Sequence, residues 1–273
     1  ALRSVGAPAL VLFFFAVLAF AVPTPAAAQI ACGDTLGPGG SHVLGADLAC
    51  STGPALTLVG PVKVDLGNHR ISCTSGGLTG VAVQGKGVSL RNGSIGGCST
   101  GVSLGGAGRH KIAELAIAGA GGYGVLATSP GNRIADVDVA DSGGSGGYGF
   151  WIAGEKHQID RCSATNVADH GFALASGSGH RVRDIVVHSA GDDGVRVGAP
   201  QTRLERVRMS DVAGSGVYSS VDDLRMKDVA VAGSASAGFV LRGTRVRGQA
   251  ADVVDAARGL DIACTGACQR KEG

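Results

Sequence analysis

A glycine followed by an apolar residue recurs along most of the chain at intervals of about 22 residues. The pairs are Gly80-Val81, Gly101-Val102, Gly124-Val125, Gly149-Phe150, Gly171-Phe172, Gly194-Val195, Gly216-Val217, Gly238-Phe239 and Gly259-Leu260. From Gly101 onward the intervals are 23, 25, 22, 23, 22, 22 and 21 residues. A fixed period of this length is typical of solenoids and arrays, so it constrains the fold more than any other feature.

The units consist of short apolar segments with Gly-rich turns between them. One apolar position recurs at Ile112, Ile134, Ile159, Val182, Leu204 and Met226, with further apolar positions three and five residues later. No unit holds ten residues with helical spacing, which excludes leucine-rich, ankyrin and TPR arrays. A WD40 blade needs about 40 residues, so the period is too short for a propeller. The pattern predicts an all-β solenoid of about nine or ten coils, in which equivalent residues stack about 4.8 Å apart.

Composition agrees with this prediction and excludes other classes. Glycine accounts for 47 of 273 residues, yet it has no three-residue period and proline is scarce, which excludes collagen. Apolar residues make up 44% of the chain, which argues against disorder. The formal net charge of +2 is too small to indicate a nucleic-acid partner, and we expect none.

The first 28 residues have the pattern of a secretory signal peptide. Arg3 is their single charge, an apolar run spans residues 9–22, and small residues precede a predicted cleavage site near Ala28 or Gln29. An uncleaved anchor is the alternative, although the run is shorter than the ~20 residues of a spanning helix. We expect a secreted monomer, extracellular or periplasmic, that is free of the membrane after cleavage. The expected divisions are the signal peptide 1–28, a disulfide-clipped cap 29–52, the β-helix 53–263 and a tail 264–273.

Six of the seven cysteines lie toward the two ends of the mature chain. Pairing between neighbours predicts Cys32–Cys50, Cys73–Cys98 and Cys264–Cys268 disulfides, as an oxidising compartment allows. Zinc binding by the last pair is the alternative, but no nearby histidine completes such a site. The seventh, Cys162, falls in an apolar column and is predicted to be a buried free thiol.

The repeat resembles the right-handed parallel β-helix of the pectate-lyase-like superfamily. The opening segments Cys32-Gly33-Asp34-Thr35 and Val64-Asp65-Leu66-Gly67-Asn68-His69 resemble secreted members of that group. The resemblance covers residues 32–263 and implies a right-handed parallel β-helix. It does not fix an activity, because this fold carries lyases, hydrolases, epimerases and proteins with no known chemistry.

Stacking of the units predicts one polar cluster. The two residues before the unit glycine are Asp169 and His170 in one coil, and Asp192 and Asp193 in the next. The three tyrosines and the single tryptophan fall on this column or on the neighbouring outward column, which also holds Arg196. We therefore predict catalytic roles for Asp169, His170, Asp192, Asp193 and Arg196, and substrate binding by Tyr148, Trp151 and Tyr218.

Exposed aromatic rings can stack on sugar faces, and paired carboxylates serve as general acid and base or hold Ca²⁺. The predicted metal ligands are Asp169, Asp192 and Asp193, with Ca²⁺ as the ion. The alternative is structural, because aspartate is common in turns and aromatic rings also cover flat sheets.

Two family comparisons bear on the chemistry. Gly191-Asp192-Asp193-Gly194 resembles the Gly-Asp-Asp element of polygalacturonase-type glycosidases, with Asp169 as the third carboxylate on the preceding coil. Ser215 stands where those enzymes carry a histidine, and their Arg-Ile-Lys motif is absent. Pectate lyases are also similar, and this resemblance implies carboxylate-held Ca²⁺ with Arg196 as the base.

Two further polar columns are predicted to be structural. His110, Asn132, His157, His180 and Thr202 form a turn ladder, for which metal binding is the alternative. Lys111, Arg133, Arg181, Arg203 and Arg225 form an outward basic row. Acidic residues recur three positions after several of them, so we expect a salt-bridged, solvated face rather than a track for an acidic polymer.

We therefore expect a secreted carbohydrate-active β-helix protein that binds an acidic polysaccharide. Whether it also cleaves the polymer is left open, and if it does, we expect a polysaccharide lyase or a glycoside hydrolase. The alternative is a non-catalytic secreted or cell-wall β-helix used for binding or scaffolding.

Overall fold

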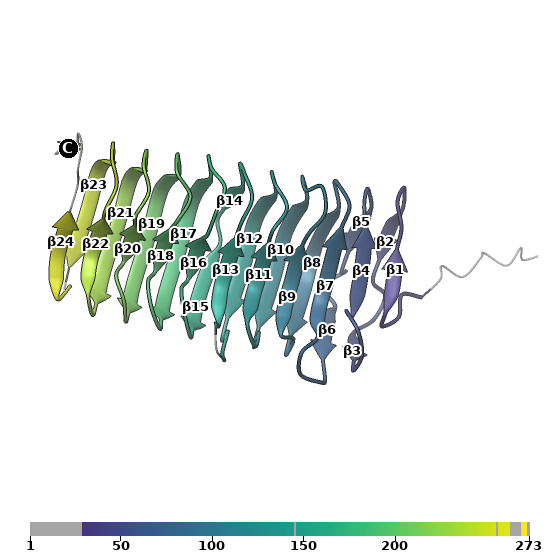
Figure 1. Cartoon of the computed structure of the whole chain (residues 1–273). Helices are drawn as coiled ribbons and strands as arrows, with labels where there is room; N and C mark the ends of the chain where they lie inside the picture. The colour runs from purple at the N-terminus through teal and green to yellow at the C-terminus, as the bar shows by residue number, and fades with distance from the viewer. Residues whose placement is uncertain (1–28, 145, 255, 263–268, 272–273) are drawn as a thin grey trace, which may run out of the picture.

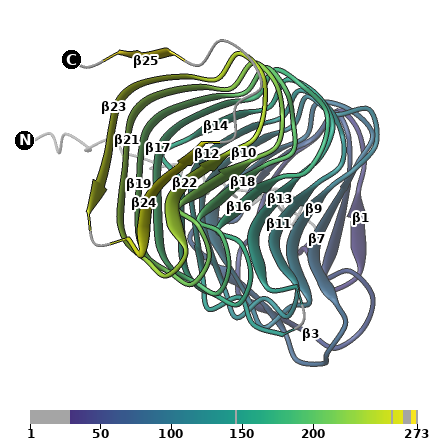
Figure 2. The same ribbon diagram turned by 60° about the vertical axis from the view of Figure 1, so that its left-hand side comes forward.

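The computed structural model describes residues 29–144, 146–254, 256–262 and 269–271. The predicted signal peptide and the predicted Cys264–Cys268 pair lie outside these residues. Every element in this part of the chain is a β-strand, and the strands wind into a parallel solenoid of about ten turns. Figure 1 shows the coils side by side along one axis, and Figure 2 looks obliquely along it. The predicted all-β solenoid is confirmed. Among the described residues, no helix is long and apolar enough to span a membrane.

Two long parallel sheets run the length of the described solenoid. The first sheet holds, in spatial order, β1 (Asp34–Leu36), β4 (Leu56–Val59), β7 (Thr79–Gln84), β9 (Thr100–Leu104), β11 (Tyr123–Ala127), β13 (Tyr148–Ile152), β16 (Phe172–Leu174), β18 (Val195–Val197), β20 (Val217–Ser219), β22 (Ala237–Leu241) and β24 (Arg258–Ile262).

The second sheet holds, in spatial order, β2 (Ser41–Val43), β5 (Lys63–Asp65), β8 (Ser89–Gly96), β10 (Lys111–Ala118), β12 (Arg133–Ala140), β14 (Gln158–Asp160), β17 (Arg181–Ala190), β19 (Arg203–Val212), β21 (Arg225–Ser234), β23 (Arg247–Val254) and β25 (Gln269–Lys271). Three further strands pair beside this path: β3 (Leu48–Cys50), β6 (Arg70–Cys73) and β15 (Ser163–Val167).

Equivalent residues of successive coils stack in register and form the core. Ile112 of β10 pairs with Ile134 of β12, which pairs with Ile159 of β14. All three are at most 1% exposed. In the first sheet, the Phe150 and Phe172 rings stack with their centroids 4.3 Å apart. The apolar columns predicted from the repeat are therefore the interior of the solenoid, where burial of apolar surface stabilises each coil against its neighbours.

A left-handed bend interrupts the long strands of the second sheet once per coil. Its residues have φ between 52° and 55°: Glu114, Asp136, Arg161, Asp184, Arg206 and Asp228. The bend lets the apolar residues before and after it both face inward although they are three positions apart. Side chains at the bend point outward and therefore also stack in a column.

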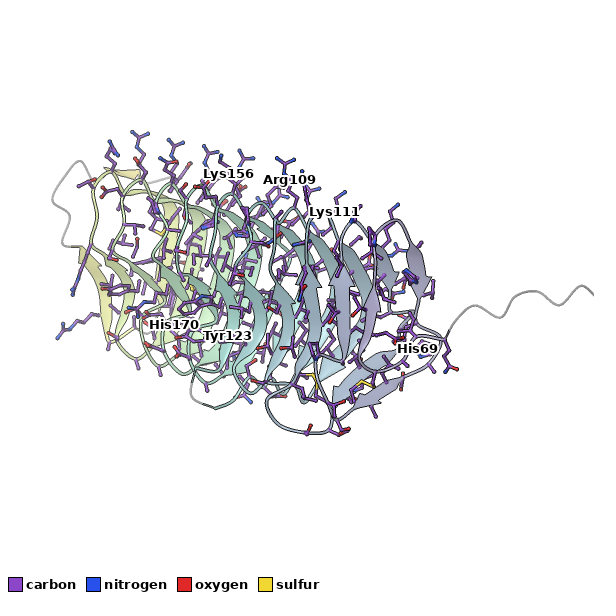
Figure 3. All side chains as sticks on the ribbon, turned by 45° about the vertical axis from the view of Figure 1, so that its right-hand side comes forward. His69, Arg109, Lys111, Tyr123, Lys156 and His170 are labelled. Carbon is purple, nitrogen blue, oxygen red and sulfur yellow. A yellow bond between two sulfur atoms is a disulfide. The ribbon has the colours of Figure 1, made fainter. Side chains whose placement is uncertain are left out.

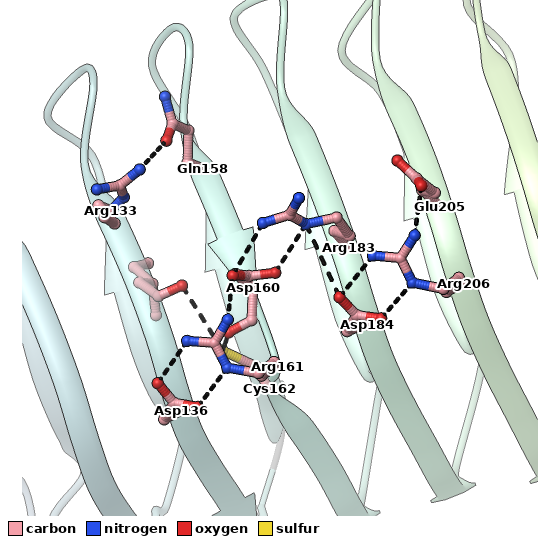
Figure 4. A network of polar contacts seen from close by, with 11 residues as sticks. Arg133, Asp136, Gln158, Asp160, Arg161, Cys162, Arg183, Asp184, Glu205 and Arg206 are labelled. Carbon is pink, nitrogen blue, oxygen red and sulfur yellow. Dashed lines mark hydrogen bonds and ion pairs between the residues drawn. The ribbon is translucent and has the colours of Figure 1, made fainter.

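Charges of opposite sign alternate around this bend and bind one another. Arg161 lies 2.7 Å from Asp136, and Arg206 lies 2.5 Å from Asp184. Arg161 also contacts Asp160, and Arg206 contacts Glu205. Figure 4 shows that these residues form a continuous network across the coils. The hydrogen bonds from Arg161 and Arg206 lower the pKa of Asp136 and of Asp184 respectively.

The histidine ladder, formed by His110, Asn132, His157, His180 and Thr202, is buried. The Nδ1 atom of His157 accepts the N–H of Asn132 at 3.3 Å, and its Nε2 lies 2.9 Å from the Ala153 carbonyl. His110 and His180 repeat this arrangement. Nδ1 links each ring to the preceding coil, and Nε2 contacts a carbonyl of its own coil. Both ring nitrogens are therefore already used, which favours the structural interpretation over metal binding.

Two of the predicted disulfides are present. Cys32 bonds to Cys50, and Cys73 bonds to Cys98. Two disulfides indicate an oxidising environment. Cys162 is a buried free cysteine, as predicted, and burial raises the pKa of its thiol to about 12. The thiol is therefore protonated and inert under ordinary conditions.

Candidate functional site

Aromatic side chains gather on the outer face of the first sheet. Tyr123 and Tyr148 begin the neighbouring strands β11 and β13, and their rings stack with centroids 5.4 Å apart. Trp151, three residues after Tyr148 on β13, meets the Tyr148 ring edge to face with the ring centroids 4.8 Å apart. All three are only partly buried. Their π-faces and edges thus form a rigid apolar platform open to solvent.

A small residue beside this platform leaves a hollow. The outward column continues from Trp151 to Ala173 of β16, then to Arg196 of β18 and Tyr218 of β20. Because alanine does not fill the space between the two large side chains, an open cavity of about 400 Å³ remains. We call it the Trp151 cleft. Its polar and aromatic lining consists of Tyr148, Trp151, Asp169, His170, Asp192 and Arg196.

The predicted polar cluster lies along one side of the cleft. Asp169 and His170 precede β16, and Asp192 and Asp193 precede β18. His170 Nδ1 lies 3.4 Å from Asp169 Oδ1, 3.8 Å from Asp192 Oδ2 and 3.9 Å from Asp193 Oδ2. The four side chains predicted to meet at one turn do meet there. Asp169 is half-buried and Asp192 is exposed, so both carboxylates face accessible space.

His170 is buried, and its hydrogen bonds define how it can act. Its Nδ1 accepts the backbone N–H of Asp193 at 3.1 Å. An accepting Nδ1 requires the neutral tautomer with the proton on Nε2. Nε2 lies 3.4 Å from Nη1 of Arg196. The imidazole N–H and the guanidinium are therefore two adjacent donors, which suits an anionic or carbonyl oxygen.

Asp193 faces the interior and is the least accessible of the three carboxylates. Its Oδ1 accepts the backbone N–H of Ser215 at 2.9 Å, and it is 4% exposed. Burial, followed by the charge of Asp192, raises the pKa of the Asp193 carboxyl. His170 and Asp193 each accept a backbone N–H from the next coil, so both also hold the coils together.

Arg196 is positioned by its neighbours. Its Nη1 lies 3.6 Å from Asp193 Oδ2, and its guanidinium carbon lies 5.0 Å from the centre of the Tyr218 ring. Tyr218 therefore supports Arg196 by a cation–π contact and does not line the cleft itself. Burial, and then the nearby charge of Asp169, raises the pKa of the Tyr148 hydroxyl, so this tyrosine is a neutral donor at the cleft wall.

Three side chains at this turn bring atoms that could bind a metal ion close together. Atoms of Asp169, His170 and Asp192 lie within 4.8 Å of one another, whereas the predicted set was Asp169, Asp192 and Asp193. Calcium takes six to eight oxygen ligands. Two accessible carboxylates do not complete such a shell, and Nδ1 of His170 already accepts a hydrogen bond. These residues alone do not form a Ca²⁺ cage.

Tyr123 and Ala173 contribute to the site but were not among the predicted site residues. Tyr123 lies in the same column as Tyr148, and that column was the available signal. Ala173 matters because its neighbours in the column, Trp151 and Arg196, are large. This difference in size can be recognised only once the register of the strands is known.

The sequence matches the family described as right handed beta helix region over residues 100–247, more than half of the chain. The chain therefore belongs to this right-handed β-helix family. No curated protein matches the sequence. The matched residues run from β9 to the start of β23 and include the whole Trp151 cleft.

Solved structures of similar fold include the catalytic domain of a GH87 alpha-1,3-glucanase in complex with nigerose. It is 12% identical, the match covers 86% of this chain and 63% of that chain, and the TM-score is 0.50. The A-module of the mannuronan C-5 epimerase AlgE6 from Azotobacter vinelandii is 15% identical over 88% of this chain and 92% of that chain, with a TM-score of 0.42. At these identities the likeness shows the fold alone.

Proposed function

We propose that this protein binds an acidic glycan in the Trp151 cleft. The proposal rests mainly on the shape of the Trp151 cleft above Ala173. An aromatic platform lies on one side of this open cavity, and two adjacent hydrogen-bond donors lie on the other. Sugar rings have apolar faces that pack on the platform. A uronate carboxylate fits the guanidinium of Arg196 and the Nε2–H of His170. The nigerose bound in the GH87 alpha-1,3-glucanase structure of similar fold is in keeping with glycan binding.

Cleavage of the same glycan is the second candidate function. Asp169 and Asp192 are accessible carboxylates beside a buried neutral histidine, which is the set of groups that general acid–base chemistry requires. Hydrolysis would use one carboxylate as acid and the other as base, whereas elimination would need a base at the uronate C5 proton. The non-catalytic alternative uses the same cleft for binding only. We further propose secretion, in line with the disulfides and the predicted signal peptide.

The single tryptophan provides a direct test of the binding proposal. Trp151 is the sole tryptophan of the chain and lines the cleft, so its fluorescence reports occupancy of this site alone. Titration with galacturonate oligomers is expected to shift the emission and to saturate, whereas neutral gluco-oligomers should bind more weakly. Arg196→Gln is expected to weaken binding of the acidic oligomers by about tenfold.

Arg208→Gln is the matched control. Arg208 is an exposed arginine on β19, so this variant loses the same charge away from the cleft and should bind as the unchanged protein does. Equal affinity of Arg196→Gln and Arg208→Gln, or no emission change with any oligomer, would contradict the proposal. Reducing ends and unsaturated-uronate absorbance, followed with and without Asp192→Asn, separate hydrolysis, elimination and binding without turnover.

A further inference from the structure

A row of basic side chains follows the solenoid axis on the second sheet. Its members occupy the first position of successive strands from β10 to β23 and pair directly in register. They are Lys111, Arg133, Arg181, Arg203, Arg225 and Arg247, and Gln158 interrupts them once. We call them the arginine row. All six side chains are exposed.

The arginine row is not neutralised. Within the described part of the chain, Lys111, Arg181, Arg203, Arg225 and Arg247 make no side-chain hydrogen bond or ion pair, and Arg133 bonds only to the neutral Gln158. The expectation of a salt-bridged face is therefore wrong for this row. The acidic residues assigned to it, Asp136 and Asp184, pair with Arg161 and Arg206 at the left-handed bend instead.

The two columns of the same sheet thus differ in electrostatic design. At the bend, opposite charges alternate and bind one another, as Figure 4 shows. In the arginine row, four arginines stack consecutively, from Arg181 to Arg247, although like charges directly opposite on neighbouring strands are destabilising. A row that opposes folding and has no partner in the protein is explained if it serves a ligand.

A groove accompanies the row over its last three coils. A cavity of about 400 Å³ is lined by Arg203, Glu205, Arg225, Lys227, Arg247 and Gln249 among others. Glu205 is its one acidic lining residue and is already bound by Arg206. The groove therefore presents hydrogen-bond donors, most of them cationic, along its length.

We propose that the arginine row is a second binding surface, and that its ligand is a linear acidic polysaccharide lying parallel to the solenoid axis. Apart from the coil of Gln158, the row offers one cation per coil at a spacing of about 4.8 Å, over roughly 29 Å from Lys111 to Arg247. Guanidinium groups bind carboxylates and sulfates through paired hydrogen bonds. A straight row of evenly spaced cationic side chains matches an extended polymer that carries one anionic group per sugar.

The types of side chain around the arginine row favour a glycan ligand over a nucleic acid. Single-stranded nucleic acids are bound by basic grooves with aromatic rings on which bases stack. The three tyrosines and the tryptophan all stand on the first sheet, away from this row. In Figure 3, Lys111 of the row lies near the upper edge of the solenoid, whereas His170 and Tyr123 lie lower on it. The proposal does not depend on the Trp151 cleft.

The test uses end-labelled polygalacturonate and fluorescence anisotropy over a series of NaCl concentrations. All proteins carry Trp151→Ala, which disables the cleft platform, so failure at the cleft and failure at the row are distinguishable. The test variant combines Arg203→Gln, Arg225→Gln and Arg247→Gln. It should bind about tenfold more weakly and lose about two units of the slope of log affinity against log salt.

The matched control combines Arg161→Gln, Arg183→Gln and Arg206→Gln, which removes the same charge from the ion-paired column of the same sheet. It should retain the affinity and the salt slope to within about twofold. Equal losses in both triple variants would mean that net charge alone governs binding and would overturn the proposal. Tighter binding of labelled oligothymidylate than of polygalacturonate would assign the row to nucleic acid instead.

Thermal unfolding adds a readout that does not involve a ligand. Because the row is self-repelling, the Arg203→Gln, Arg225→Gln, Arg247→Gln variant should unfold at the same or a higher temperature than the unchanged protein. A clear fall in its unfolding temperature would show that the arginines stabilise the fold, and the proposal would then lose its main argument.

Discussion

At the recurring glycines from Gly80 to Gly238, a backbone carbonyl of the next coil occupies the space where a side chain would begin. A Cβ atom at Gly171 would lie 2.7 Å from the Gly194 carbonyl oxygen and 2.6 Å from Cγ1 of Val187. The same clash recurs at Gly124, Gly149, Gly194 and Gly216. The strongest signal in the sequence thus has a steric cause, namely the close approach of one coil to the next.

Gly171→Ala should therefore destabilise the fold by about 1–3 kcal/mol, because neither the carbonyl nor the buried valine can move freely. Urea unfolding followed by circular dichroism measures this change. Gly143→Ala is the control, since a Cβ at that exposed glycine meets nothing within 4 Å. It should change stability by no more than about 0.5 kcal/mol. Similar costs at the two positions would contradict the packing explanation.

The polar residues that line the Trp151 cleft could be predicted from the sequence because their proximity depends on stacking alone. Once the period is known, Asp169, His170, Asp192 and Arg196 must lie on neighbouring coils at one turn. The orientation of Asp193 could not be predicted in this way. It faces inward because its carboxylate accepts the Ser215 N–H, and that bond depends on where β18 and β20 begin.

At the scale of elements, the turn between the two sheets is held by the histidine ladder. Burial lowers the pKa of His157 to about 4 and also lowers the pKa of His110 and of His180. In the unfolded chain these groups titrate near pH 6.5. The unfolded state therefore binds more protons between these values, and the stabilising contribution is complete above pH 6.5 and is lost as the pH falls toward 4.

We expect the free energy of unfolding to fall by about 3 kcal/mol for His157 alone between neutral pH and pH 4. Urea unfolding at a series of pH values measures this slope. His157→Asn is the informative variant, because Asn132 already fills one ladder position through its own amide. Its stability should depend less steeply on pH. An unchanged slope in this variant would show that other groups govern the pH dependence.

The left-handed bend in the second sheet, and the ion pairs that it forms between coils, could not be predicted from the sequence. Acidic residues three positions after basic ones suggested pairing within the strand. The left-handed conformation at Asp136, Arg161, Asp184 and Arg206 turns these side chains toward one another across coils instead. Bend geometry of this kind has no clear sequence signal, because aspartate, glutamate and arginine all occupy it.

At the scale of the whole molecule, each coil is stabilised by its two neighbours, and a terminal coil has only one. The N-terminal coils compensate through the Cys32–Cys50 and Cys73–Cys98 disulfides. Local opening should therefore be rarest in the middle of the solenoid, and the first coils should owe part of their protection to the covalent links.

Hydrogen exchange with and without a reducing agent tests this prediction. Backbone amides of β13 and β16 should exchange slowly under both conditions. Amides of β1 and β4 should exchange at least about tenfold faster after reduction, because removing a disulfide typically costs a few kcal/mol. Equal acceleration in β1 and β13 would instead indicate that the described solenoid unfolds as a single cooperative unit.

The arginine row gains or loses one cation with each coil, since every strand of the second sheet begins one step further along the axis. Duplication of a single 22-residue unit beyond β21 would lengthen the row by one charge and leave the Trp151 cleft unchanged. The number of coils would then act as a ruler for the bound polymer, so that the length of glycan held is encoded in how many times the chain repeats itself.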